Sequence, residues 1–151
     1  MKIYLVAVGK IKDEHIQKKI QEYVKRLGKG IELVVCELAD GKGAPERMIE
    51  DEGRRIIARL PKSGYIVALD ERGELLTSID FAQLIKKVIN QGRDVIFIIG
   101  GAYGLSEEVK KRADKILALS KMTFPHELAR LILIEQIYRA LNILQKTGYH
   151  H

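Results

Sequence analysis

The sequence is poor in cysteine and lacks any long hydrophobic run. A single cysteine, Cys36, excludes a disulfide within the 151-residue chain, so the cytoplasm is the expected compartment. No catalytic motif surrounds Cys36, and we interpret it as a small core residue. No apolar stretch approaches the ~20 residues that a membrane-spanning helix needs, so we expect no membrane partner.

Motifs for metal binding and for a nucleophilic serine are missing as well. The segment "PHELAR" begins like a zinc-binding H-E-x-x-H helix, but Arg130 stands where the second histidine is needed. The other histidines, His15, His150 and His151, are distant in the sequence. No Ser, His and Asp arrangement with a nucleophile elbow occurs. We therefore expect neither a metal site nor a serine hydrolase.

A glycine-rich loop is present, but it lacks the residues of a dinucleotide site. Gly100, Gly101 and Gly104 follow a predicted strand and precede a predicted helix, which would let a ligand approach the backbone. The acid expected about 20 residues later is absent, because Ser120 and Lys121 stand there. This disfavours an NAD-dependent enzyme. The glycines alone are compatible with either a ligand-binding loop or a simple turn.

The net charge of +6 is compatible with a polyanionic partner such as nucleic acid. Acidic residues are interleaved with the basic ones, so solvated helix faces explain the charge nearly as well. At this length the chain can form one hydrophobic core, and we expect a single domain over residues 1–151.

Apolar runs alternate with amphipathic stretches along the whole chain. The pattern predicts an α/β fold with a mostly parallel sheet flanked by helices. Pro45 fits a first helical turn, Ser78 and Ser106 fit N-caps, and Gly28 fits a C-cap. The predicted strands are 2–8, 31–38, 65–69, 95–99 and 115–119, and the predicted helices are 13–27, 45–60, 79–90, 106–112 and 125–145.

Ligands of open parallel sheets bind beyond the carboxyl ends of the strands. Three segments occupy such places, "LDERGE", "GGAYG" and "LSKMTFP", and each follows a continuous apolar strand. The last of them joins its strand abruptly to the final helix. We expect the three segments to converge at one edge of the sheet.

The final predicted helix is apolar on most of its circumference. Such a helix needs cover on two sides, so we expect it to contact its own sheet and a second subunit. Arg130, Glu135 and Arg139 interrupt the apolar surface, either as salt-bridge partners or as catalytic or RNA-contacting residues. The tail that follows contains Tyr149 and His150, which are suited to stacking and proton transfer if the tail covers a site.

Several blocks together resemble one family: "VALDERG", "GRDVIFIIGG", "IGGAYGLS", "LSKMTFPHELARLILIEQIYRA" and "YHH". Over nearly its whole length the sequence resembles the RlmH family of the SPOUT superfamily. Its members are bacterial enzymes that methylate N3 of a pseudouridine in 23S ribosomal RNA. The resemblance implies a C-terminal deep trefoil knot whose backbone forms the pocket for S-adenosylmethionine. Carried over by position, the cofactor-binding residues are Leu69, Gly101, Leu119, Ser120, Lys121, Met122, Thr123, Phe124 and Pro125.

The resemblance also implies the reaction and its partners. Its substrate would be 23S rRNA within the assembled ribosome, and the enzyme would be a homodimer in which the tail of one subunit closes the other's site. We hypothesise that His150 or Glu135 receives the N3 proton, that Arg139 binds phosphate or orients the base, and that Tyr149 packs on the nucleotide. Family tails commonly have Arg or Lys where this chain has His151, which would weaken a phosphate contact there. A non-enzymatic ribosome- or RNA-associated binding protein on the same fold is the alternative.

Overall fold

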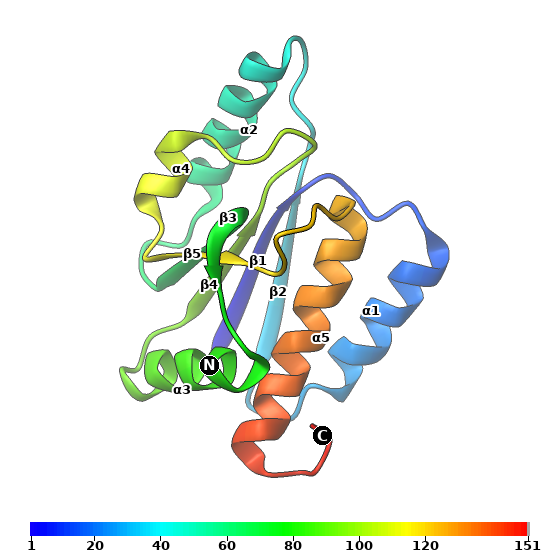
Figure 1. Cartoon of the computed structure of the whole chain (residues 1–151), viewed down its shortest axis with the longest axis vertical. Helices are drawn as coiled ribbons and strands as arrows, with labels where there is room; N and C mark the ends of the chain where they lie inside the picture. Colours follow the sequence, from blue (N-terminus) through cyan, green and yellow to red (C-terminus); the bar gives the residue numbers. More distant parts are fainter. Residues whose placement is uncertain (151) are drawn as a thin grey trace.

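Five parallel strands form the centre of the molecule. In a computed structural model, which describes residues 1–150, the strands are β1 (Lys2–Val8), β2 (Glu32–Leu38), β3 (Tyr65–Leu75), β4 (Val95–Ile99) and β5 (Lys115–Ala118). They lie in the order β2-β1-β4-β3-β5, and every neighbouring pair is parallel (Figure 1). This confirms the predicted parallel α/β architecture. The continuous apolar runs in β1 and β4 arise because both strands are central and are covered on both faces.

Helices cover the two faces of the sheet. They are α1 (Glu14–Arg26), α2 (Pro45–Arg59), α3 (Ser78–Asn90), α4 (Glu107–Arg112) and α5 (His126–Gln145). One core lies under α1, α3 and α5 and includes Phe81, Phe97 and Ile137. The second core lies under α2 and α4 and includes Ile56 and Val109. Helix α5 contacts both α1 and α3, so it is the central helix of its layer (Figure 1).

Local capping confirms some predicted boundaries and corrects others. Ser106 caps α4 by accepting a hydrogen bond from the Val109 amide, and Pro45 opens α2 as predicted. The predicted N-cap Ser78 is wrong, because Thr77 caps α3 and Ser78 is already helical. The predicted C-cap at Gly28 is also wrong. Helix α1 ends in an extended Leu27, and Gly28 is not in the left-handed conformation that would have required glycine.

Strand β3 extends six residues beyond its predicted end. Leu117 of β5 pairs with both Leu69 and Glu74, so residues 70–73 form a bulge between them. The segment "DERG" has the polar composition of a turn, and the prediction that the strand ends at Leu69 is wrong for that reason. After the bulge β3 pairs with β5 again, and the end of the bulge lies close to the backbone of β5.

Gly73, the last residue of the bulge, lies against the backbone of β5. A Cβ atom added to Gly73 would lie 2.7 Å from the backbone carbonyl carbon of Ile116, and backbone atoms cannot move aside cheaply. We expect Gly73→Ala to lower the free energy of unfolding by about 1–3 kcal/mol, as overpacking typically does. Urea denaturation measures the change. Gly28→Ala is the matched control, because nothing lies within 4 Å of the added methyl group. An equal loss of stability in both variants would contradict the close contact between Gly73 and β5.

Candidate active site

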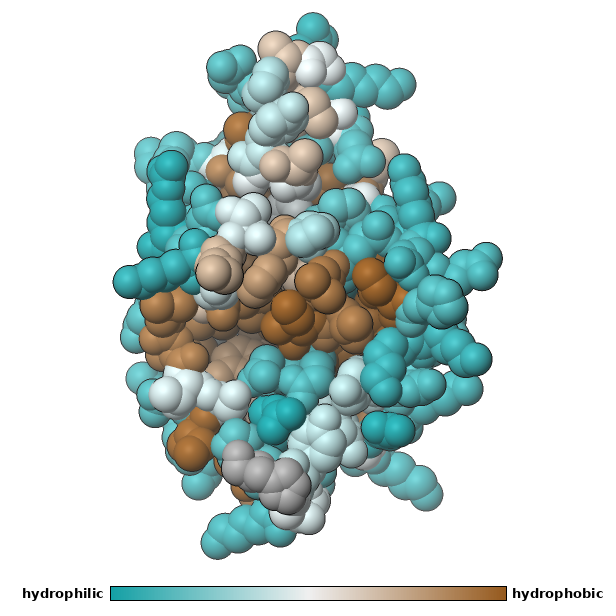
Figure 2. Space-filling view, turned by 45° about the vertical axis from the view of Figure 1, so that its right-hand side comes forward, coloured by the Kyte–Doolittle hydropathy of each residue, from teal (hydrophilic) through white to brown (hydrophobic). Residues whose placement is uncertain are grey.

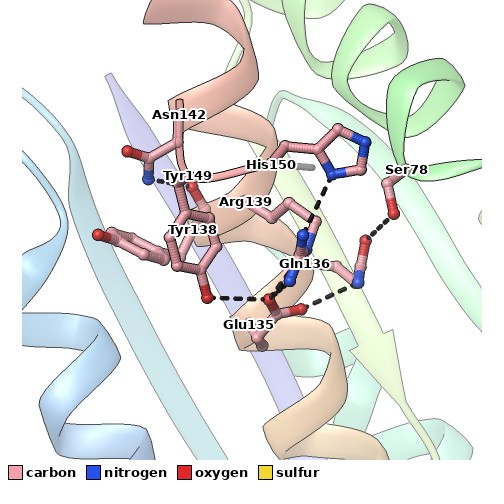
Figure 3. A network of polar contacts seen from close by, with 8 residues as sticks. All are labelled: Ser78, Glu135, Gln136, Tyr138, Arg139, Asn142, Tyr149 and His150. Carbon is pink, nitrogen blue, oxygen red and sulfur yellow. Dashed lines mark hydrogen bonds and ion pairs between the residues drawn. The ribbon is translucent and has the colours of Figure 1, made fainter. Parts of the chain in front are cut away.

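The four residues predicted to be catalytic lie together, Glu135 and Arg139 on α5 and Tyr149 and His150 on the tail (Figure 3). Glu135 is at the centre of this group. One of its carboxylate oxygens accepts hydrogen bonds from Arg139 Nε at 2.9 Å and from Arg139 Nη2 at 2.6 Å, and from the Tyr149 hydroxyl at 3.2 Å. Its other oxygen accepts from Gln136 Nε2 at 2.9 Å. Glu135 therefore fixes the orientation of Arg139 and of the tail.

The tail folds back onto α5 through aromatic contacts. The Tyr149 ring packs edge-on against Tyr138, with ring centres 4.8 Å apart. The Arg139 guanidinium lies over the Tyr149 ring, 4.9 Å from its centre. Tyr138 in turn contacts Tyr23 of α1, with 5.6 Å between the ring centres. The tail is thus held by a stack of side chains.

The contact between Arg139 and His150 indicates which nitrogen of the imidazole accepts a hydrogen bond. Arg139 Nη1 lies 3.1 Å from His150 Nδ1. A guanidinium can only donate hydrogen bonds, so Nδ1 is the acceptor in this contact. The neutral imidazole then carries its proton on Nε2. Arg139 thus occupies Nδ1 of His150 in this arrangement.

Tyr149 acts as a donor in this network. Burial, the hydroxyl of Tyr23 and the negative charge of Glu135 raise the pKa of Tyr149 to about 12. Its hydroxyl therefore stays protonated far above neutral pH and donates to Glu135. Glu135 in turn raises the pKa of Arg139, which keeps this guanidinium charged.

The raised pKa of Tyr149 gives a measurable pH dependence. The unfolded chain loses this proton near pH 10 and the folded chain near pH 12, so the stabilising effect is complete below pH 10 and is lost between pH 10 and 12. We expect one tyrosine to titrate late in the tyrosinate absorbance of the folded protein, and we expect Tyr149→Phe to abolish that late component. A late component that persists in Tyr149→Phe would contradict this assignment.

A pocket of about 160 Å³ lies next to this network. Gln136 and Ser78 lie on its wall and are joined by a hydrogen bond of 2.7 Å from the Ser78 hydroxyl to Gln136 Oε1 (Figure 3). Since Gln136 also donates to Glu135, the pocket is one side chain away from the predicted catalytic group. The rest of the wall is mostly apolar and comprises Leu76, Thr77, Phe81, Leu117, Ala118, Leu119 and Ile132.

The predicted cofactor residues lie at the carboxyl ends of three neighbouring strands. Leu69 precedes the β3 bulge, Gly101 follows β4, and Leu119 follows β5 and lines the pocket. Thr123 donates a hydrogen bond to Glu71 of the bulge, so the segment after β5 is tied to β3. The predicted convergence of the three segments is thus seen for two of them. The remaining predicted cofactor residues, Ser120, Lys121, Met122, Thr123, Phe124 and Pro125, do not line the pocket.

Within one chain the two predicted parts of the site lie apart. The segment 119–125 ends where α5 begins at His126, whereas Arg139 is 13 residues further along the same helix. At 1.5 Å per residue this corresponds to about 20 Å. Leu119 and Gln136 both line the pocket and so connect the two parts.

Sequence reasoning missed several residues that organise this region. The pairing of Gln136 with Ser78 joins residues 58 positions apart, and no local pattern indicates it. The role of Arg130 was left open. Its side chain is buried, pairs with Glu37 and donates to the Gly9 carbonyl oxygen at 2.8 Å. The sequence feature that could have indicated this role is a charged residue within an apolar helix. Here it marks a salt bridge that anchors the first turns of α5.

Residues 1–150 show neither a metal-binding cluster nor a membrane-spanning helix. No group of three or more His, Cys, Asp or Glu side chains is arranged to hold a metal ion there. None of the described helices combines the length and apolar character needed to cross a membrane. His151, the other residue of the predicted tail contact, lies outside the described residues.

Comparison with known proteins identifies the family of this chain. A sequence profile described as "Predicted SPOUT methyltransferase" matches residues 1–150. The chain belongs to the SPOUT methyltransferase family. Proteins named "Ribosomal RNA large subunit methyltransferase H" from Carboxydothermus hydrogenoformans and Trichlorobacter lovleyi are both 44% identical to it. The alignments cover 99% of both chains in the first case and 100% in the second.

Other SPOUT relatives carry the same name. The protein from Halothermothrix orenii is 42% identical over 99% of both chains, and the one from Geotalea daltonii is 39% identical over the full length of both. The family resemblance inferred from the motifs is therefore confirmed. As a SPOUT family member, the chain is an enzyme of the methyltransferase class.

Proposed function

We propose that the protein transfers a methyl group from S-adenosylmethionine to N3 of a pseudouridine in 23S rRNA of the assembled ribosome. The observation that carries this proposal is the Glu135–Arg139–Tyr149–His150 network beside the pocket. It combines a fixed cation with an imidazole in a family of methyltransferases whose relatives are named for ribosomal RNA. We place the reaction in the cytoplasm, with the ribosome.

The residues present fit the methyl donor in chemical character. The pocket wall combines apolar side chains such as Leu76, Phe81 and Leu117 with a few polar groups, as small-molecule sites do. Its volume is about half of the smallest usual ligand site, so we assign the rest of the cofactor site to Leu69, Gly101 and the segment 119–125. When bound, S-adenosylmethionine supplies an electrophilic methyl group whose bond to a positively charged sulfur breaks as N3 attacks.

A threaded backbone would fit this assignment. We propose that the segment 119–125 and α5 pass through the loop formed by β3 and its bulge, as in the deep trefoil knot of the SPOUT superfamily. The close approach of Gly73 to the backbone of β5 and the hydrogen bond from Thr123 to Glu71 both fit such a path. The threading would fix the backbone of the cofactor segment, which accounts for the abrupt join between β5 and α5.

The protein's own residues handle the proton and the base. Four hydrogen bonds occupy the carboxylate of Glu135, so we assign to it the orientation of Arg139 and Tyr149. His150 Nδ1 is the better proton acceptor, and it becomes available when Arg139 turns to the incoming RNA. In that state Arg139 would bind phosphate or orient the base, and Tyr149 would pack on the nucleotide.

A homodimer would complete the site. The separation of about 20 Å along α5 leaves the catalytic group of one chain distant from most of its own cofactor segment. Large apolar side chains near that segment are exposed, among them Met122 at 75% and Leu128 at 37%. Figure 2 shows hydrophobic side chains gathered in a band across one face of the molecule. A second copy that covers such a surface would bring its tail to the cofactor segment.

Transfer of a tritiated methyl group tests the enzyme directly. We expect label from S-adenosylmethionine to enter 23S rRNA in ribosomes from a strain that lacks this methylation. A non-enzymatic ribosome-associated protein on the same fold is the second candidate, and it would transfer no label. Calorimetry with S-adenosylmethionine separates the two, because a binding protein with a degenerate pocket would give no heat of binding.

A further inference from the structure

Most of the net charge of the chain is concentrated in one segment. Residues 10–29, which include α1, contain seven Lys and Arg residues and three Asp and Glu residues, a net charge of +4 out of +6 for the whole chain. The apolar residues of α1 face the rest of the molecule, and its basic residues face solvent. The charge is therefore concentrated on α1 and the residues that flank it rather than spread evenly along the chain.

Three of these cations lie at the end of α1 and are unpaired. Lys25, Arg26 and Lys29 are exposed, and none forms an ion pair with another residue in the range 1–150. The nearest acid on the helix, Glu22, is engaged by Lys19 at 3.2 Å. We call Lys25, Arg26 and Lys29 the α1 basic surface.

The N-terminal ammonium group adds to this charge. It donates a hydrogen bond of 3.1 Å to the carbonyl oxygen of Gly30, directly after Lys29. Tyr149 of the C-terminal tail is also linked to α1, because it contacts Tyr138, which contacts Tyr23.

A continuous series of aromatic contacts joins the α1 basic surface to the catalytic group. The Arg26 guanidinium lies 5.9 Å from the ring centre of Tyr23. Tyr23 contacts Tyr138, Tyr138 contacts Tyr149, and Tyr149 lies under Arg139. The α1 basic surface is therefore linked through the contacts of Tyr23 and Tyr138 to the residues assigned to the target base.

We propose that the α1 basic surface docks ribosomal RNA by binding the phosphates next to the target nucleotide. The inference rests on the proposed function. Lysine and arginine neutralise phosphates without reading sequence and thereby fix the register of the strand. Aromatic rings beside such cations suit unstacked bases, which are what a base-modifying enzyme must present to its site.

The test compares two triple variants of the full-length protein. Lys25→Gln/Arg26→Gln/Lys29→Gln removes the α1 basic surface. Lys42→Gln/Arg59→Gln/Lys62→Gln is the matched control, because it removes three exposed positive charges from around α2, on the opposite face of the sheet. Methyl transfer to ribosomes is measured over a range of salt concentrations, together with the affinity for S-adenosylmethionine.

The α1 variant should raise KM for ribosomes roughly tenfold or more, with little change in kcat or in cofactor affinity. The slope of log(kcat/KM) against log[salt] should become shallower by about 2, which corresponds to three phosphate contacts to a single strand. The α2 control should behave like wild type. Lys25→Arg/Arg26→Lys/Lys29→Arg, which keeps all three charges, should restore KM.

Two results would overturn the inference. One is an α1 variant with unchanged KM and salt slope, and the other is an α2 control with an equal loss. If wild type itself transfers no methyl group to ribosomes, the proposed function fails and the docking inference fails with it. Wild-type transfer with an unaffected α1 variant removes the docking inference alone.

Discussion

Arg139→Ala is expected to reduce methyl transfer to ribosomes about 10²- to 10³-fold, while the affinity for S-adenosylmethionine stays near that of wild type. Loss of one preorganised charged donor from a site typically has an effect of this size. Arg139 donates two hydrogen bonds to Glu135 and contacts both Tyr149 and His150, so its removal also frees these two tail residues. Within residues 1–150 its hydrogen bonds go to Glu135 and His150, neither of which is assigned to the cofactor.

Three comparison variants sharpen this prediction. Arg139→Lys keeps the charge but cannot donate two bonds to one carboxylate oxygen, and it should show an intermediate loss. Arg112→Ala removes an exposed arginine from α4 and should keep full activity. His150→Ala should reduce turnover through loss of the proposed proton acceptor. Single-turnover rates measure these effects, and an Arg139→Ala enzyme with wild-type turnover would remove this residue from the mechanism.

Arg130→Ala is expected to lower the free energy of unfolding by about 3 kcal/mol. The change leaves the Gly9 carbonyl oxygen without its donor and Glu37 without its cation, and breaking a buried pair usually costs about 3–5 kcal/mol. We take the lower end of that range because the Glu37 side chain is 37% exposed. For a chain of this size the melting temperature should fall by about 10 °C.

An exposed ion pair provides the control for Arg130. Arg54 pairs with Asp51 on α2, and its side chain is 69% exposed. Arg54→Ala should therefore change the free energy of unfolding by less than about 1 kcal/mol. Differential scanning calorimetry of the two variants separates the predictions. Equal losses would show that burial does not distinguish these two arginines.

The anchoring role of Arg130 links stability to the site. The first turn of α5 is also held by Glu127, which accepts hydrogen bonds from the amides of Lys12 and Asp13. These contacts fix the helix end that follows the segment 119–125. A loosened α5 should therefore weaken cofactor binding as well as the fold.

The sheet was predictable because each buried strand leaves its own pattern in a short stretch of the sequence. Central parallel strands are buried on both faces, so β1 and β4 appear in the sequence as unbroken apolar runs. The bulge in β3 was not predictable in the same way. Asp70 to Gly73 have turn-like composition, and the strand resumes only because β5 offers a partner at Leu117 and Ala118.

The site was predictable only in part. Glu135 and Arg139 stand four residues apart on a helix, a spacing that favours a salt bridge. The position of Tyr149 and His150 depends on how the tail folds back, which sequence periodicity does not encode. Their roles came from the family resemblance. The contact of Gln136 with Ser78 required the packing of α5 against α3 and could not be inferred from either segment alone.

The central claim is best tested by analysis of the modified nucleoside itself. Ribosomes from a strain without this methylation are incubated with the protein and S-adenosylmethionine, the 23S rRNA is digested, and the nucleosides are identified by mass spectrometry. We predict one pseudouridine that gains a single methyl group at N3 in assembled ribosomes and little in free 23S rRNA. Methylation of another nucleotide, or none at all with a protein that binds S-adenosylmethionine, would contradict the account.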